Sequence, residues 1–266
     1  MFKKIFFWCL YLIAAPLVGI SLLLSLWRIK TKAKKYKRDH SGFFLDDRFR
    51  MIMRQASKLL YLRRVKVKCQ GFNGLPSTPV IYVVNHKSNL DSVALLKAIR
   101  NYEQLSKLCF VAKKEIQKSQ LISSALDIID TIFIDRDNPR AVFEAYEKQI
   151  QAVNEGRSIV VFIEGHRYFM DQLGEFKAAA LKIAYKTYKP IVPIVIYGSS
   201  GLMDKNKDNL NKKRTIHIHA LNIMKHNAYA TSKEEYAAQY LKGIMQEKYN
   251  EMKQLDIKNE LNTLEE

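Results

Sequence analysis

The stretch Val80-Ile81-Tyr82-Val83-Val84-Asn85-His86-Lys87-Ser88-Asn89-Leu90-Asp91 decides the predicted fold of this chain. Its apolar run ends in a polar stretch, and the mostly apolar residues from Ser92 to Ile99 that follow suit a helix. A strand that is apolar throughout is typical of a sheet whose two faces are both covered. The stretch therefore predicts a buried strand, a polar turn and a helix, which together form one unit of a layered α/β fold.

Similar units recur along the chain from residue 65 onward. The predicted strands are Val65–Cys69, Val80–Val84, Leu108–Ala112, Thr131–Ile134, Ile159–Ile163, Ile191–Ile196 and Thr215–Ala220. The predicted helices are Ser92–Arg100, Pro139–Asn154, Phe176–Tyr188 and Lys233–Leu255, and a polar loop is expected at Asp204–Arg214. This alternation favours an α/β fold with a mostly parallel central sheet covered by helices.

The N-terminal region carries an uncharged and mostly apolar run, Ile5–Trp27, of 23 residues. A helix of that length reaches about 35 Å, which is enough to cross a hydrocarbon core of about 30 Å. We expect a retained membrane anchor, because a signal peptide has a shorter apolar core of about 7–15 residues that ends at a small-residue cleavage site. Pro16 and Gly19 leave two forms open, a kinked spanning helix or a helical hairpin that dips into one leaflet.

Basic residues flank this run unevenly. Lys3 and Lys4 precede it, whereas seven lysines and arginines follow it between Arg28 and Arg38. The positive-inside tendency places the rest of the chain in the cytoplasm, and the same cluster suits anionic headgroups. Asp46–Arg64 has apolar residues at helical spacing among basic ones, which predicts an amphipathic basic helix. The expected organisation is a membrane anchor and basic linker at residues 1–40, the amphipathic helix at 41–64, the α/β domain at 65–255 and a polar tail at 256–266.

Composition narrows the classes of partner and site. A formal net charge of +18 means attraction to polyanions, whether an anionic lipid surface, a phosphorylated substrate or nucleic acid. No nucleic-acid-binding signature accompanies the charge, so we expect no nucleic acid partner. The widely spaced Cys9, Cys69 and Cys109 form no C-x-x-C pattern, so neither a disulfide framework nor a structural zinc site is expected.

His86 and Asp91 are the first candidate catalytic residues. An imidazole can take a proton from an alcohol near neutral pH, and a carboxylate can fix its tautomer and stabilise its charged form. Residues five apart point about 140° away from each other on one helix. The pair can therefore meet only if His86 lies in the turn and Asp91 in the first helical turn. The alternative interpretation is a capping box, in which Asp91 accepts from an N-terminal amide near Ser88.

Further charged residues follow other predicted strands, at the positions where open α/β sheets bind ligands. In the stretch Phe162–Arg167, the guanidinium of Arg167 matches phosphate oxygens and Gly165 permits a tight turn. Glu164 could accept from a substrate hydroxyl or hold the arginine. Arg136 and Lys113 follow two more strands, in Ile132–Asp137 and Phe110–Glu115. The ordinary alternative for all these groups is a solvated surface charge.

Taken in order, the patterns N-H-x-x-x-x-D, F-V-A-K-K, F-I-D-R, F-I-E-G-x-R and I-V-P-I-V, behind an apolar segment, resemble the glycerolipid acyltransferase family. The resemblance covers about residues 60–220. It implies that His86 is the general base and that Asp91 is its partner. It also implies an acceptor-binding site that contains Lys113, Arg136, Glu164, Gly165 and Arg167.

The implied reaction transfers a fatty acyl group from a thioester, acyl-CoA or acyl carrier protein, to the hydroxyl of 1-acyl-glycerol-3-phosphate. The product is phosphatidic acid, and the reaction takes place at a phospholipid membrane with the catalytic domain facing the cytoplasm. Neither a bound cofactor nor a metal is implied, and backbone amides near His86 are the expected oxyanion donors. Glycerol-3-phosphate and other lysophospholipids stay open as acceptors.

The third motif departs from the family pattern F-P-E-G-T-R, because Ile163 replaces the proline and His166 replaces the threonine. The loss of proline frees a backbone amide but leaves the charged residues in place. His166 adds a titratable group beside the site, where it could contact phosphate, carry a proton or only pack. The departure leaves the choice of acceptor open.

Three other classes of function are weighed against this one. The charge favours a non-catalytic, membrane-tethered protein that binds anionic lipid or nucleic acid. A serine hydrolase would need a G-x-S-x-G turn, which Gly198-Ser199-Ser200-Gly201 does not supply. A metal enzyme would need more than His217 and His219, which share one face of a predicted strand without a carboxylate or cysteine to complete a site.

Overall fold

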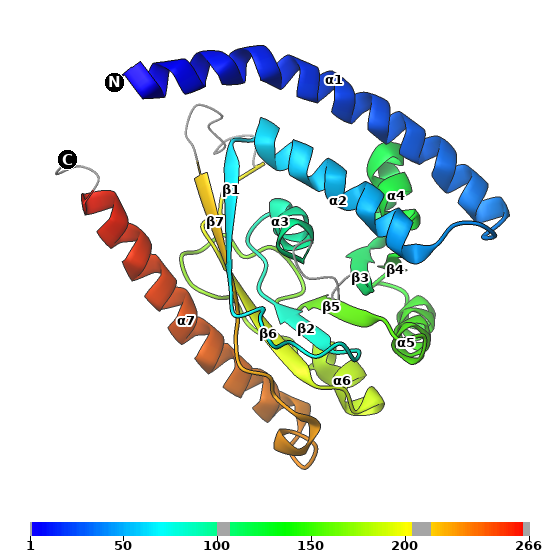
Figure 1. The fold of residues 1–266 in the computed structure, drawn as a ribbon. Helices are drawn as coiled ribbons and strands as arrows, with labels where there is room; N and C mark the ends of the chain where they lie inside the picture. Colours follow the sequence, from blue (N-terminus) through cyan, green and yellow to red (C-terminus); the bar gives the residue numbers. More distant parts are fainter. Residues whose placement is uncertain (1, 100–106, 204–213, 263–266) are drawn as a thin grey trace.

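The computed structural model describes residues 2–99, 107–203 and 214–262. Its centre is a seven-stranded sheet, which confirms the predicted α/β fold (Figure 1). The strands are β1 (Val65–Gln70), β2 (Ile81–Val84), β3 (Leu108–Lys113), β4 (Ile132–Ile134), β5 (Ser158–Phe162), β6 (Ile191–Tyr197) and β7 (Arg214–Ala220). Their order is β1-β7-β6-β2-β5-β3-β4, and every neighbouring pair is parallel except β6 with β7. The carboxyl ends of β2, β5, β3 and β4 therefore lie side by side.

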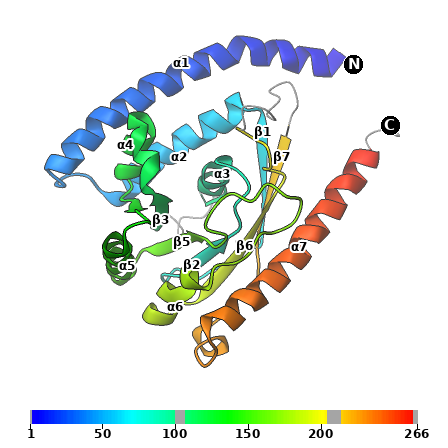
Figure 2. The ribbon, with the colours of Figure 1, turned by 180° about the vertical axis from the view of Figure 1, so that it is seen from behind.

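Helices cover both faces of this sheet (Figures 1 and 2). Residues along β2 alternate between the two faces, so Tyr82 and Val84 join a core with α1, α2 and α3, while Ile81 and Val83 join a core with α5, α6 and α7. All four side chains are fully buried. Two apolar cores explain why the central strands β2 and β6 are apolar throughout, because both faces of these strands are covered. The outer strand β1 differs, since Lys66 and Lys68 on one of its faces are exposed.

The helices are α1 (Phe2–Arg38), α2 (Leu45–Leu62), α3 (Leu90–Ile99), α4 (Gln120–Asp127), α5 (Pro139–Asn154), α6 (Lys182–Thr187) and α7 (Glu234–Asn262), with 3₁₀ segments η2 (Lys114–Lys118), η3 (Ala178–Leu181) and η4 (His226–Ala228). The helix expected at Phe176–Tyr188 is a 3₁₀ turn followed by a short helix, and η2 and α4 were not anticipated. The helix expected to end at Leu255 continues to Asn262, so the expected polar tail is helical over most of its length. The loop expected at Asp204–Arg214 lies outside the described residues, except for Arg214.

Helix α1 is continuous through Pro16, so the hairpin form of the anchor is not adopted. Its Cys9–Arg38 part is long and apolar enough to cross a membrane. The helix nevertheless lies along the α/β domain, antiparallel to α2 (Figure 1). Tyr11 donates to the carbonyl of Leu62 at the end of α2, and Lys58 in the C-terminal part of α2 donates to Ser21 and Ser25. The whole span from Tyr11 onward is therefore tied to the rest of the protein.

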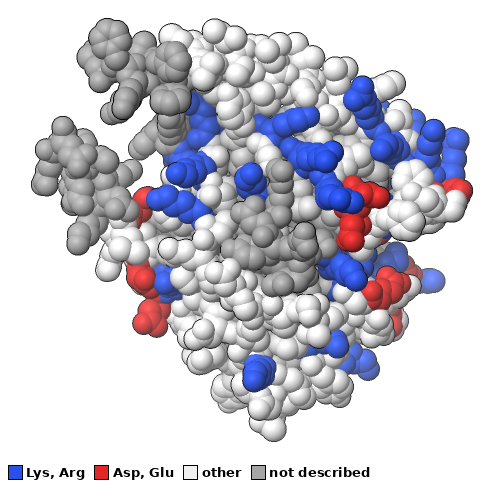
Figure 3. All heavy atoms as spheres, viewed as in Figure 1, with Lys and Arg blue, Asp and Glu red and all other residues white. Residues whose placement is uncertain are grey.

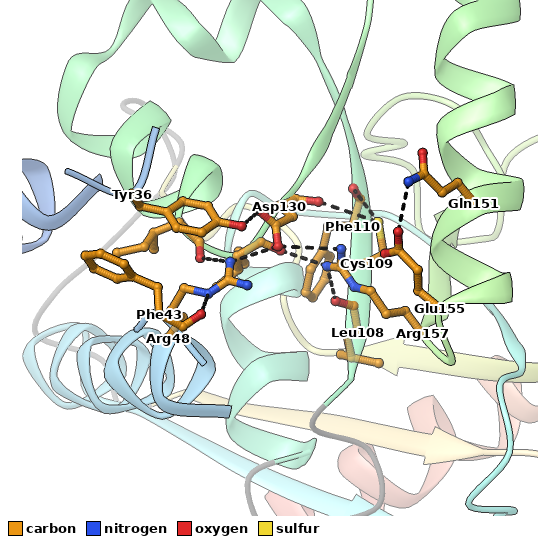
Figure 4. A network of polar contacts seen from close by, with 12 residues as sticks. Tyr36, Phe43, Arg48, Leu108, Cys109, Phe110, Asp130, Gln151, Glu155 and Arg157 are labelled. Atoms are coloured by element: carbon orange, nitrogen blue, oxygen red, sulfur yellow. Dashed lines mark hydrogen bonds and ion pairs between the residues drawn. The ribbon is translucent and has the colours of Figure 1, made fainter. Parts of the chain in front are cut away.

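The carboxylate of Asp130, in the turn between α4 and β4, fixes the C-terminal part of α1 (Figure 4). It accepts from the Tyr36 hydroxyl at 2.6 Å and from the Arg48 guanidinium of α2 at 2.8 Å. Arg157, before β5, lies 3.7 Å from the same carboxylate and donates to two backbone carbonyls. Both guanidiniums are buried, and burial is tolerated because each has charge and hydrogen-bond partners. One carboxylate thus joins α1, α2 and the sheet.

Candidate active site

His86 and Asp91 meet where β2 passes into α3. His86 lies in the turn and Asp91 in the first turn of the helix, and the imidazole Nδ1 is 2.8 Å from the Asp91 Oδ2. The same oxygen accepts from the backbone N–H groups of Lys87 at 2.6 Å and Ser88 at 2.7 Å. Asp91 therefore caps the helix and orients the histidine at once, so the two interpretations of the sequence describe one arrangement. Because Asp91 occupies Nδ1, Nε2 is the nitrogen left to accept a proton.

Buried polar contacts hold the turn that carries His86. The side chain of Asn85 donates to the carbonyl of Ile196 at 2.9 Å and accepts from its N–H at 2.7 Å, which fixes the end of β2 to β6. The imidazole is 18% exposed and stacks on the ring of Phe162 at a centroid distance of 4.2 Å. A fixed ring with one accessible edge is the geometry that a general base requires.

Glu164 has a different place from the one expected. It is fully buried, and its two carboxylate oxygens accept from the backbone N–H groups of His86 and Gly174, each at 2.6 Å. It therefore holds two backbone segments together and does not pair with Arg167 or face a substrate. Burial raises the pKa of the Glu164 carboxyl, although the two amides and Lys87 act against that shift.

The backbone amides near His86 are already occupied. Those of His86, Lys87 and Ser88 donate to the carboxylates of Glu164 and Asp91. The expectation that this turn supplies oxyanion donors is therefore wrong for these three amides, because their hydrogen atoms point at other acceptors. The capping interpretation of the sequence anticipated the amide bond of Ser88 to Asp91, whereas the bond of the His86 amide to Glu164 could not be foreseen because Glu164 is distant in the chain.

The predicted cationic residues lie at the carboxyl edge of the sheet, beside the histidine. Arg136 follows β4 and donates to the carbonyl of Gly165, which follows β5. Gly165 has a φ of 74°, and a Cβ at this position would lie 3.2 Å from the Arg136 guanidinium, so the turn favours glycine. Lys113 ends β3 and pairs in register with Ile134, near Arg136. Lys113, Arg136 and Arg167 are all exposed, as is His166.

An apolar cavity of about 300 Å³ adjoins the other side of the Phe162 ring. Its walls come from α1, α2, α3, β3, η2 and α4, and its lining includes Leu22, Leu26, Leu96, Phe110, Ala125 and Phe162. The Phe162 ring therefore contacts the imidazole of His86 and also lines the apolar cavity, and Ala112, which precedes Lys113, lines the same cavity. No sequence signal indicated the cavity, because its lining residues are spread over seven elements, with Phe162 of β5 included, that meet only in the fold.

Metal ligands do not gather near this site. In residues 2–99, 107–203 and 214–262, no group of three or more His, Cys, Asp or Glu side chains is placed to hold a metal ion. His217 lies 3.8 Å from Asp256 and His219 lies 3.2 Å from the Gln70 side chain, so each imidazole has a local partner.

The site thus combines a histidine–carboxylate pair, exposed cations and an apolar cavity at the edge of an α/β sheet. A family model described as Acyltransferase matches residues 66–197. A probable 1-acyl-sn-glycerol-3-phosphate acyltransferase of Mycoplasma genitalium is 38% identical over 198 residues, which is 74% of each chain. A relative of the same description from Mycoplasma pneumoniae is equally similar over the same length.

A solved structure has the same fold. The crystal structure of the 1-acyl-sn-glycerophosphate acyltransferase of Thermotoga maritima superposes with a TM-score of 0.62 at 21% identity, covering 89% of this chain and 98% of that one. Together with the family match and the Mycoplasma relatives, the comparisons define the class. The chain belongs to the acyltransferase family, as the order of its motifs predicted.

Proposed function

We propose that this enzyme transfers a fatty acyl group from an acyl thioester to the free hydroxyl of 1-acyl-glycerol-3-phosphate, forming phosphatidic acid for phospholipid synthesis. The observation that carries the proposal is the 2.8 Å contact between His86 and Asp91, at a sheet edge that also carries exposed cations and has an apolar cavity behind it that Phe162 lines. The names of the Mycoplasma relatives support the same acceptor.

His86 acts as the general base. Its Nε2 takes the proton of the acceptor hydroxyl while the hydroxyl oxygen attacks the thioester carbonyl. Asp91, on Nδ1, stabilises the imidazolium that forms. The C–S bond then breaks, and the thiolate leaves with the proton that the imidazolium returns. The products are an ester and a free thiol, so no acyl-enzyme and no cofactor is required.

The cationic row binds the acceptor phosphate. Lys113, Arg136 and Arg167 present ammonium and guanidinium groups at the strand ends next to β2, where they hold the phosphate and bring the hydroxyl to His86. Gly165 gives the chain the tight turn that this row needs. Glu164 does not contact the phosphate; it holds the site in place by accepting hydrogen bonds from the backbone amides of His86 and Gly174.

The acyl chain of the donor occupies the apolar cavity behind Phe162. The cavity is lined almost entirely by apolar groups, and Leu22 and Leu26 of α1 form part of its wall. Transfer of each buried methylene from water contributes about 0.8 kcal/mol, so such a cavity favours a long chain. A donor chain and a membrane-facing helix therefore share one apolar compartment.

Helix α1 lies in one leaflet of the cytoplasmic membrane face. Eight apolar side chains of α1 are 50–69% exposed: Leu10, Leu12, Ile13, Leu17, Ile20, Leu23, Leu24 and Trp27. Lysines and arginines gather over α2 and the C-terminal part of α1, where they meet anionic headgroups (Figure 3). The contacts of α1 with α2, α4 and Asp130 favour a helix parallel to the surface, because a spanning orientation would break them.

The activity is tested with purified protein in mixed micelles. Acyl-CoA and acyl carrier protein thioesters are offered with glycerol-3-phosphate, 1-acyl-glycerol-3-phosphate and other lysophospholipids, and the lipid products are identified by mass spectrometry. We expect phosphatidic acid, and we expect His86→Ala to lower kcat by about a thousandfold. His219→Ala, on β7, serves as the control. Full turnover by the His86 variant would refute the assigned base.

The placement of α1 is tested by adding protein with an N-terminal epitope to preformed anionic vesicles. A helix within one leaflet leaves the epitope open to external protease on every molecule. A spanning helix would protect the epitope inside the vesicle, and that result would overturn the proposed placement.

A further inference from the structure

Lys87, next to the catalytic histidine, is a buried cation that the proposed mechanism does not use. Its side chain is 1% exposed. The Nζ donates to the carbonyl of Met170 at 2.9 Å and to the carbonyl of Gln172. It also lies 5.0 Å from the ring centroid of Tyr168 and 5.2 Å from that of Tyr249 in α7. A lysine buried so fully serves a defined purpose, because desolvation of its ammonium is costly.

The carbonyls that Lys87 binds belong to residues 163–177, the loop between β5 and η3, which we call the β5–η3 loop. This loop contains the buried Glu164 near its start and, three residues later, the exposed Arg167. Its other anchors are the N–H of Tyr168 on the carbonyl of His86 at 2.8 Å and the N–H of Leu173 on the side chain of Gln246 at 2.8 Å. Glu164 also joins the amide of His86 to that of Gly174 in this loop, and Lys87 adds a second side-chain link, to the carbonyls of Met170 and Gln172.

Charge explains why the link is a lysine. Asp91 and Glu164 are both fully buried, one on each side of the turn, and Asp171 lies on the loop. These three carboxylates act on the Lys87 ammonium from α3, from the end of β5 and from the loop, while two tyrosine rings face it from the loop and from α7. Burial lowers the pKa of Lys87, and the three carboxylates oppose that shift. Asp91 and Glu164 also accept from backbone amides, and Asp171 pairs with Lys253 of α7. The Lys87 ammonium adds a positive charge among these carboxylates.

We propose that Lys87 is a positioning residue that docks the β5–η3 loop against the catalytic turn, and so sets Arg167 for the acceptor phosphate. This inference rests on the proposed function, since it gives Arg167 the phosphate as its ligand. Lys87 touches no substrate itself. Its effect reaches the reaction through the loop, so its loss acts on the phosphate-bearing acceptor more than on the thioester.

The kinetic test compares Lys87→Met with the wild-type enzyme, on 1-acyl-glycerol-3-phosphate and on the phosphate-free 1-acyl-glycerol. We expect the KM for the phosphate acceptor to rise at least tenfold and the KM for the thioester to change less than twofold. The preference for the phosphate acceptor should fall about tenfold. Arg157→Met is the matched control, because Arg157 is also buried and donates to two backbone carbonyls, but far from His86. A Met variant that keeps the full preference would overturn the proposal.

A second measurement does not depend on activity. Hydrogen exchange of the amides of residues 168–174 should become at least tenfold faster in Lys87→Met and stay unchanged in Arg157→Met. Lys87→Gln retains one donor and should give a smaller acceleration, so it provides the test if the Met variant does not fold. Unchanged exchange in both Lys87 variants refutes the docking role, even if the wild-type enzyme transfers no acyl group. Faster exchange without acyl transfer would instead support the docking and refute the proposed reaction.

Discussion

Substitution of Glu164 by glutamine tests whether a buried carboxylate holds the catalytic turn from beneath. The two oxygens of Glu164 accept from the amides of His86 and Gly174, at 2.6 Å each. A glutamine side chain offers one acceptor and one NH₂ group, so one of these amides must face another donor in either orientation. Loss of a hydrogen bond to a charged acceptor costs about 1.5–3 kcal/mol.

The turn can relieve the conflict only by moving the amide of His86 or of Gly174. We therefore expect Glu164→Gln to lower kcat/KM by about a hundredfold, which corresponds to about 2.7 kcal/mol. The assay measures initial rates with saturating thioester and varied acceptor, together with the free energy of unfolding in urea. Glu175→Gln is the control, since Glu175 is exposed and pairs only with Lys177 on the surface. A Glu164 variant within twofold of the wild type in both measurements would refute the reasoning.

Three other substitutions and one pH effect follow from the same contacts. Asp91→Asn should lower kcat by about a thousandfold without a comparable rise in KM in initial-rate assays. All three hydrogen bonds fall on one oxygen, which the asparagine carbonyl can replace, but a neutral amide does not stabilise an imidazolium as a carboxylate does. Ala125→Phe should fill the apolar cavity and shift the preferred donor to shorter chains, and an unchanged profile in a competition between thioesters would contradict the assigned cavity. Tyr36→Phe should lower the free energy of unfolding by about 1 kcal/mol through its lost hydrogen bond to Asp130, as measured by urea denaturation. The raised pKa of Glu164 means that the folded state binds the proton of this carboxyl more tightly than the unfolded state does. The stability of the wild type relative to Glu164→Gln should therefore grow as the pH falls through that pKa and shrink as the pH rises. Unfolding curves at several pH values would show the opposite trend if the carboxyl were not desolvated.

The strands and the contact between His86 and Asp91 could be predicted from the sequence because their signals are local. The apolar run before Asn85 can only be a buried strand, and the spacing from His86 to Asp91 allows contact across a strand-to-helix turn alone. The structure confirms the fold from these signals, and each strand differs from its predicted range by one residue at one or both ends. Local sequence patterns were sufficient to predict the structure wherever the neighbours of a residue in the sequence also determine its surroundings in the fold.

The signals failed where distant contacts decide the structure. Helix α4 is short, has no buried residue and packs on α1, so its own sequence does not predict a helix there. The proximity of Glu164 to Arg167 in the sequence suggested an ion pair, whereas two amides from other segments take both carboxylate oxygens. Lys87 reads as a solvated turn residue until the β5–η3 loop covers it.

The course of α1 has a practical consequence for anyone who prepares this enzyme. Removal of an N-terminal anchor is a common way to obtain a water-soluble form of a membrane enzyme. Here, removal of the first 38 residues would delete the wall of the apolar cavity that Leu22 and Leu26 form. It would also leave the Asp130 carboxylate without the Tyr36 hydroxyl and uncover the surface that buries Ile29 and Ala33. The shortened protein would be a damaged catalyst rather than a released one, so purification should rely on detergent or nanodiscs and keep the helix in place.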